Sequence, residues 1–113
     1  MKNPKKNLYE GMYILNASLS EEAVKHSLAR VTDPVEGHGG EILKVFNQGR
    51  KKLAYEINGH KQGYYYLVYF SVIPGAISDM WKEYHLNEDL VRFMTLRVDT
   101  VPEKIEFKPI GEE

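Results

Sequence analysis

The sequence contains no cysteine, no long apolar run and no marked excess of charge of either sign. The lack of cysteine excludes a disulfide scaffold, thiol catalysis and cysteine-ligated metal sites. No stretch approaches the roughly 20 apolar residues of a membrane span, and the basic start lacks the apolar run of a signal peptide, so we expect a cytoplasmic protein outside any membrane. Fifteen Lys and Arg residues stand against 16 Asp and Glu residues, a formal charge of -1. Any anion-binding site must therefore be a local patch.

Patterns typical of catalytic and cofactor-binding sites are also missing. The four histidines are scattered without the paired spacing of a metal site, and no serine lies in a nucleophile-elbow context. The glycine-rich segment GHGG at 37–40 is not followed by the Lys-Ser or Lys-Thr pair of a phosphate loop. We therefore predict that the chain is not an enzyme and that it has no cofactor, metal ion or small-molecule substrate.

The length of 113 residues suits a single domain with one hydrophobic core. We expect a basic arm over residues 1–7, a core over 8–99 and an extended or mobile tail over 100–113. Hydrophobic periodicity predicts the order β-α-β-β-α-β within the core. The expected strands cover 8–15, 41–57, 63–73 and 90–98, with helices in the two longer intervals. One consistent arrangement is an α+β ferredoxin-like sandwich, a four-stranded antiparallel sheet with both helices on one face.

The first helix has a start signal and an ambiguous end. Ser18 and Glu21 have the spacing of a capping box, and four apolar residues that follow recur with helical spacing, which predicts one buried stripe. Pro34 would kink or stop this helix, or it would begin a new turn capped by Asp33. Further along, Gly49 is expected to mark a bulge inside the second strand.

The segment GYYYLVYFSVI at 63–73 is apolar or aromatic on both faces of the predicted third strand. Side chains on a strand alternate between faces, and only Ser71 is polar in the whole run. A sheet with helices on one side and water on the other should instead show a polar residue at every second position. We therefore expect something other than water to cover the second face.

The consecutive residues Arg50, Lys51 and Lys52 form the most informative group of charges. Because strand residues alternate, these three side chains cannot share one face, and they could join the lysines of the arm in a phosphate-binding patch. Solvated lysines without a ligand are an equally compatible interpretation. Arg92 and Arg97, on opposite faces of the last strand, are further candidates.

The third strand partly resembles the RNA-recognition motif. The octamer QGYYYLVY matches the strand signature of that family at five positions and departs from it at Gln62 and Tyr65. Under this alternative, Tyr13, Tyr64 and Tyr66 would stack on bases of single-stranded RNA.

A second resemblance extends over nearly the whole chain. The blocks LYEGMYIL, GGEILKVFNQGRKKLAYEI and YHLNEDLVRFMTLRV occur in the order and near the spacing of the bacterial small-subunit ribosomal protein six family. The run GRKKLAY at 49–55 is similar to a signature of that family. Two departures are Glu56, where the family often has proline, and Pro34 inside the first helix.

The resemblance implies a ferredoxin-like protein without enzymatic activity. Such a protein sits in the cytoplasm within the small ribosomal subunit, where it binds the central domain of small-subunit ribosomal RNA together with small-subunit ribosomal protein eighteen. On this basis the second face of the sheet would contact the partner protein, although packing inside the fold is an alternative for every tyrosine concerned. With Arg50 added from the basic segment, the RNA contacts would be Tyr9, Arg50, Lys51, Lys52, Arg92 and Arg97, and the partner interface would include Tyr64, Tyr66 and Tyr69.

Overall fold

The secondary structure follows the predicted order β-α-β-β-α-β. The computed structural model describes residues 5–57 and 59–103, so parts of the predicted arm and tail lie outside the described residues. No helix within these ranges is long and apolar enough to cross a membrane. The elements are β1 (Asn7–Asn16), α1 (Glu21–Gly37), β2 (Glu41–Ile57), β3 (His60–Val72), α2 (Ala76–His85) and β4 (Leu90–Arg97).

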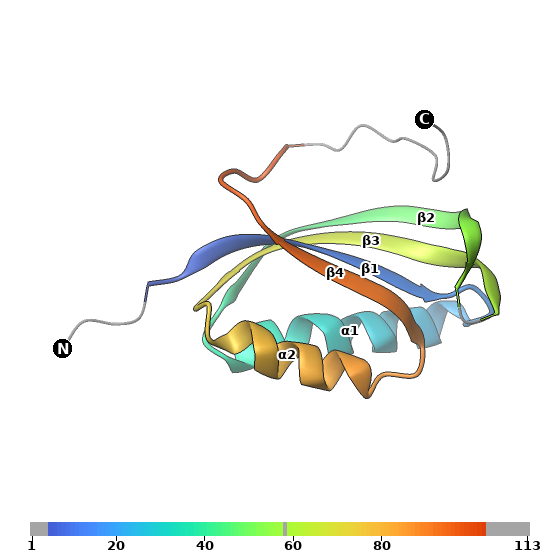
Figure 1. The fold of residues 1–113 in the computed structure, drawn as a ribbon, viewed down its shortest axis with the longest axis horizontal. Coiled ribbons are helices and arrows are strands. Elements are labelled where there is room, and N and C mark those ends of the chain that lie inside the picture. The colour runs from blue at the N-terminus through green and yellow to red at the C-terminus, as the bar shows by residue number, and fades with distance from the viewer. Residues whose placement is uncertain (1–4, 58, 104–113) are drawn as a thin grey trace.

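The four strands form one antiparallel sheet in the order β2-β3-β1-β4. Both helices cover the same side of this sheet, and the opposite side carries no helix in the part of the chain that the structure describes (Figure 1). The central strands β1 and β3 pair without a register shift, from Asn7 opposite Val72 to Asn16 opposite Gly63. The architecture is therefore the predicted ferredoxin-like α+β sandwich.

The main core lies between the sheet and the two helices. Tyr13 and Phe70, from the two central strands, are fully buried there. The Tyr13 hydroxyl donates to the hydroxyl of Tyr84 in α2 at 3.3 Å, and the Tyr84 hydroxyl donates to the carbonyl of Val31 in α1 at 2.8 Å. Because an unpaired buried polar group costs about 1–3 kcal/mol, these two hydrogen bonds let tyrosines occupy the core while they link β1 to both helices.

Helix α1 runs without interruption through Pro34, which lies inside the helix near its C-terminal end. The predicted N-cap is corrected by two residues. The Ser20 side chain accepts a hydrogen bond from the backbone N–H of Ala23 at 3.2 Å and caps the helix, whereas Ser18 lies in the preceding turn and binds the side chain of Asn16. Ser20 forms the cap because it directly precedes the first helical residue, and a side chain at that position reaches the free backbone N–H groups of the first turn. The predicted apolar stripe of α1 lies in the core.

Strand β2 contains the predicted bulge. Gly49 has φ of +77°, in the left-handed region that glycine adopts without strain, and the pairing register with β3 shifts between Asn47 and Gly49. The turn that follows β2 is shorter than predicted, because β3 begins at His60 instead of Gly63. Part of the predicted turn therefore extends the β2-β3 hairpin.

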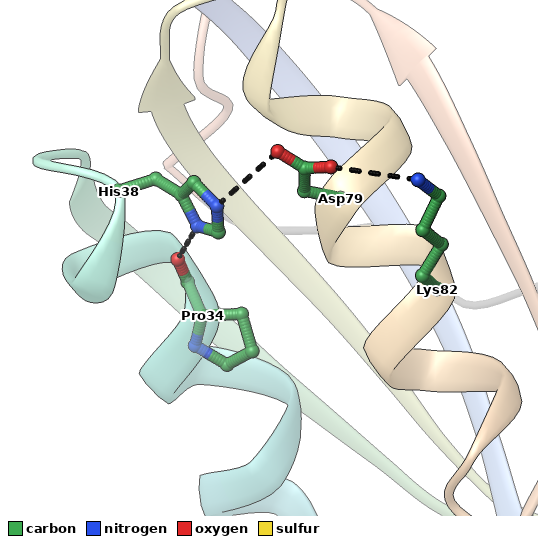
Figure 2. A network of polar contacts seen from close by, with 4 residues as sticks. All are labelled: Pro34, His38, Asp79 and Lys82. Carbon is green, nitrogen blue, oxygen red and sulfur yellow. Dashed lines mark hydrogen bonds and ion pairs between the residues drawn. The ribbon is translucent and has the colours of Figure 1, made fainter.

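His38 ties the C-terminal end of α1 to α2 (Figure 2). Its Nδ1 lies 2.7 Å from the carbonyl oxygen of Pro34, and since a carbonyl can only accept, Nδ1 is the donor. Its Nε2 lies 3.9 Å from one carboxylate oxygen of Asp79, whose other oxygen lies 3.9 Å from Lys82 Nζ. His38 therefore has a structural role, because it links the C-terminal end of α1 to α2. Within the described ranges, no group of three or more His, Asp or Glu side chains could hold a metal ion.

Candidate nucleic-acid and partner-protein interface

The helix-free side of the sheet, which we call the open face, carries aromatic and aliphatic side chains from all four strands. Residues opposite each other in paired strands point to the same face. Since Tyr13 and Phe70 face the helices, their strand neighbours Met12 and Tyr69 face the other way. Leu96 is 52% exposed on this face. The apolar and aromatic residues of the open face are Met12, Ile14, Phe46, Leu53, Tyr55, Tyr65, Leu67, Tyr69, Met94 and Leu96, and its charged residues include Glu10, Lys44, Lys51 and Arg92.

The distal end of the β2-β3 hairpin covers one part of the open face. Leu53 of β2 is buried there with Ile14 of β1 and Tyr65 of β3, in a small second core. The guanidinium of Arg92 in β4 donates a hydrogen bond to the hydroxyl of Tyr55 in β2 at 2.9 Å. Because β2 and β4 are the two edges of the sheet, this bond shows that the hairpin end crosses over the central strands.

The three consecutive cations of β2 point in alternate directions, as predicted. Arg50 lies opposite Tyr64 and points to the helix side, whereas Lys51 lies opposite Gly63 and points to the open face. Lys52 is exposed and follows the direction of Arg50. The edge strand therefore presents positive charge on both sides of the sheet.

Two cations flank the ring of Tyr65 beneath the hairpin end. Lys51 Nζ lies 5.4 Å from the centroid of this ring and donates a hydrogen bond to Gln48 at 3.1 Å. Partial burial lowers the pKa of Lys51. Burial raises the pKa of Tyr65, and the positive charge of Arg92 opposes that rise. Tyr65 therefore lies near Lys51 of β2 and within the electrostatic influence of Arg92 of β4, two residues far apart in the sequence.

Among the described residues, no carboxylate neutralises Arg50, Lys52, Arg92 or Arg97. The ion pairs within this part of the chain involve His38, Lys61 and Lys82.

Three tyrosines of the predicted contact set face the helices instead of the open face. Tyr9 is 8% exposed, and its ring stacks on Phe70 with 5.7 Å between centroids. Tyr66 is buried in the main core, and Tyr64 packs against that core. These side chains pack inside the fold because this parity of β1 and β3 faces α1 and α2. We therefore remove Tyr9, Tyr64 and Tyr66 from the candidate interface.

The same parity overturns the alternative based on the RNA-recognition motif. That alternative requires Tyr13, Tyr64 and Tyr66 to offer their rings to RNA bases. Tyr13 is fully buried beneath the helices, and the other two rings share its face. The open face has Tyr65 and Tyr69 instead, and these two rings are themselves buried, at 4% and 3% exposed.

Tyr69 lies on the open face as part of a second cluster, away from the hairpin end. Its hydroxyl donates to the carboxylate of Glu10, and its ring meets the Phe46 ring edge to face at 5.9 Å. Burial, followed by this hydrogen bond, raises the pKa of Tyr69. Lys44 Nζ lies 5.4 Å from the Phe46 ring centroid and donates to the backbone carbonyl of Glu103 at 2.6 Å. The segment after β4 therefore reaches the edge strand β2.

Arg97 lies apart from the other cations. It is the last residue of β4 and pairs with Tyr9 on the helix side, whereas Arg92 pairs with Ile14 on the open face. The predicted opposite faces of the two arginines are confirmed. The structure does not bring Arg97 into the group around the hairpin end.

Tyr55 is a residue of the candidate site that sequence reasoning missed. Its side chain is 63% exposed, yet its hydroxyl holds the Arg92 guanidinium. The signal was present in the run GRKKLAY, because counting by two from Lys51 puts Leu53 and Tyr55 on the same face as that lysine.

Comparison with known proteins identifies the family. A family model described as ribosomal protein S6 matches residues 8–97. The chain belongs to the ribosomal protein S6 family. Small ribosomal subunit protein bS6 of Protochlamydia amoebophila is 61% identical over 107 residues, which are 95% of this chain and 94% of that protein. The bS6 protein of Chlamydia caviae is 56% identical over 112 residues, which are 99% of this chain and 100% of that protein.

A solved structure of the S6 family agrees with the fold. The crystal structure of 30S ribosomal protein S6 from Thermotoga maritima matches with a TM-score of 0.78 and 29% identity, over 83% of this chain and 89% of that chain. Membership of the S6 family confirms three expectations. The chain is a structural protein of the ribosome, it is not an enzyme, and it belongs to the small ribosomal subunit in the cytoplasm.

Proposed function

We propose that this S6 family protein binds the central domain of small-subunit ribosomal RNA together with small-subunit ribosomal protein eighteen. The observation that carries the proposal is the division of the open face into two parts. Lys51 and Arg92 lie beside the hairpin end, whereas Phe46 and Leu96 lie in a part without a covering helix, where apolar side chains surround Glu10 and Lys44. Cations suit an RNA backbone, and apolar side chains suit a protein partner.

Phosphate contacts by Lys51 and Arg92 would position the protein on RNA without reading its sequence. Arg50 and Lys52 add exposed charges on the other side of the same strand, and no carboxylate pairs with either of them in the described ranges. The formal charge of -1 for the whole chain limits long-range attraction to RNA, so a basic partner would supply part of the affinity.

Exposed apolar side chains support the assignment of a protein partner. Met94 is 40% exposed and Leu96 is 52% exposed on β4, and both point to the open face. Large apolar side chains exposed next to each other on one strand favour an interaction site. Covering it would remove apolar area from water, which stabilises a complex by about 25 cal/mol per Å² before the costs of association.

Binding to a central-domain RNA fragment tests the proposal. The chain alone, small-subunit ribosomal protein eighteen alone and the equimolar mixture would be titrated against that fragment and against an unrelated RNA of equal length. We expect the mixture to bind the cognate fragment at least about tenfold more tightly than either protein alone. Equal affinity with and without the partner would contradict joint binding, and equal affinity for both RNAs would contradict the assignment to the central domain.

A further inference from the structure

A small hollow opens on the open face beside the hairpin end, with a volume of about 240 Å³. Its lining includes the buried side chains of Ile14, Leu53 and Tyr65, and the exposed side chains of Tyr55 and Arg92. Residues from all four strands take part, because the hairpin end crosses the sheet and reaches β4. The hollow therefore exists only in the folded chain.

We propose that this hollow holds one unpaired base of the bound RNA, with the base against the Tyr55 ring and its phosphate beside Arg92. The inference rests on the proposed RNA-binding function and adds to it a site for a single nucleotide. It also adds Tyr55 to the binding residues.

The dimensions and lining of the hollow favour a single planar group. Pockets that enclose whole small molecules span roughly 300–1,000 Å³, so this smaller hollow suits one ring system. Its lining contains aromatic and aliphatic side chains, one arginine and no carboxylate. Aromatic side chains bind unpaired bases by stacking, irrespective of base identity.

The charge around the hollow favours RNA over an apolar side chain of the partner protein. Arg92 lies in the lining, and Lys51 lies 5.4 Å from the Tyr65 ring centroid. A leucine or phenylalanine of a partner would leave Arg92 without a counter-charge among the described residues, whereas a nucleotide brings its phosphate with its base. Arg92 therefore favours a nucleotide as the occupant.

The hydrogen bond between Arg92 and Tyr55 prepares the site before RNA arrives. The Tyr55 hydroxyl accepts from Arg92 at 2.9 Å, which fixes an otherwise exposed ring next to the hollow. A hydroxyl acceptor leaves the guanidinium its full charge and its remaining N–H donors, so Arg92 can still bind a phosphate. Ordering both side chains in the free protein lowers the entropic cost of binding.

Substitution of Tyr55 tests the proposal in the complete complex of this chain, small-subunit ribosomal protein eighteen and the central-domain RNA. Loss of one base stack predicts that Tyr55→Ala weakens RNA binding by about 5- to 160-fold. Tyr55→Phe keeps the ring and should stay within about threefold of the unchanged protein. Leu86→Ala removes another exposed apolar side chain, 74% exposed on the helix side, and should leave the RNA affinity unchanged. Tyr55 is itself exposed, so its replacement should not unfold the chain.

Two further readouts separate stacking from other roles. Stacking releases no counterions, so the slope of log affinity against log salt should be the same for Tyr55→Ala and the unchanged chain. Chemical probing of the RNA should show one unpaired base that the unchanged complex protects and that the Tyr55→Ala complex leaves reactive.

Each contrary result has a distinct meaning. If Tyr55→Ala binds RNA as tightly as the unchanged chain, no base occupies the hollow, although the proposed RNA-binding function still stands. If Tyr55→Ala weakens RNA-free binding of protein eighteen, the hollow holds a side chain of the partner, and the inference is wrong. If the unchanged complex binds no RNA at all, the proposed function is wrong, and the inference that rests on it is wrong as well.

Discussion

Leu96→Ala is expected to weaken the binding of small-subunit ribosomal protein eighteen and to leave the stability of the free chain nearly unchanged. Leu96 lies on the open face of β4 and is 52% exposed. Full burial of a leucine side chain is worth about 1.5–3 kcal/mol. About half of this side chain is still available to a partner, so covering it would contribute about 0.8–1.5 kcal/mol. A loss of this size raises the Kd roughly 4- to 13-fold.

Calorimetric titration of the two proteins without RNA measures this effect directly, and urea unfolding of each variant measures stability. Leu86→Ala is the matched control, because Leu86 is 74% exposed but follows α2 on the helix side. It should bind the partner like the unchanged chain. An unchanged Kd for Leu96→Ala, or an equal loss for Leu86→Ala, would refute the assignment of the apolar open face to the partner.

Three more predictions concern Lys52 of the basic segment, the buried Tyr84, and the glycines Gly40 and Gly75. Lys52→Ala should reduce the salt slope of RNA binding by about 0.9, one counterion, and an unchanged slope would remove Lys52 from the contacts. Burial raises the pKa of Tyr84 from 10.0 to about 12, so its contribution to folding is complete below pH 10 and falls by roughly 2 kcal/mol as the pH rises to 12. Urea unfolding of Tyr84→Phe should show a smaller alkaline loss, because Tyr13 and Tyr69, whose pKa values are also raised, still titrate. A loss equal to that of the unchanged chain would exclude Tyr84 as a source. Gly40→Ala should lower the stability by about 1–3 kcal/mol in thermal unfolding, because a Cβ there would clash with the backbone carbonyl of Ser71. Gly75→Ala, with open space around its Cβ, should be neutral, and equal Tm values for the two variants would argue against the clash.

Local rules were sufficient to predict the order of the elements. The spacing of apolar residues along the chain identifies strands and helices, and both the buried stripe of α1 and the bulge at Gly49 follow from short-range patterns. The errors at this level were small. The cap is Ser20 instead of Ser18, and β3 begins at His60 instead of Gly63, because each boundary depends on which of several competing hydrogen bonds forms.

The function of individual tyrosines depended on tertiary packing. Alternation shows from the sequence that Tyr64 and Tyr66 share one face and Tyr65 and Tyr69 the other. It cannot show which face the helices cover, because both faces of β3 are apolar. The packing of α1 and α2 decided this, and it placed Tyr64 and Tyr66 on the helix side.

The sequence by itself determined the S6 family resemblance, the fold class and the presence of a basic segment, since these depend on residue types and short spacings. Only the tertiary structure brought Tyr55, Tyr65 and Arg92 to one hollow. Their proximity comes from the order of strands in the sheet and from the hairpin end that crosses it. Such contacts between distant residues have no counterpart in the spacing of residues along the chain.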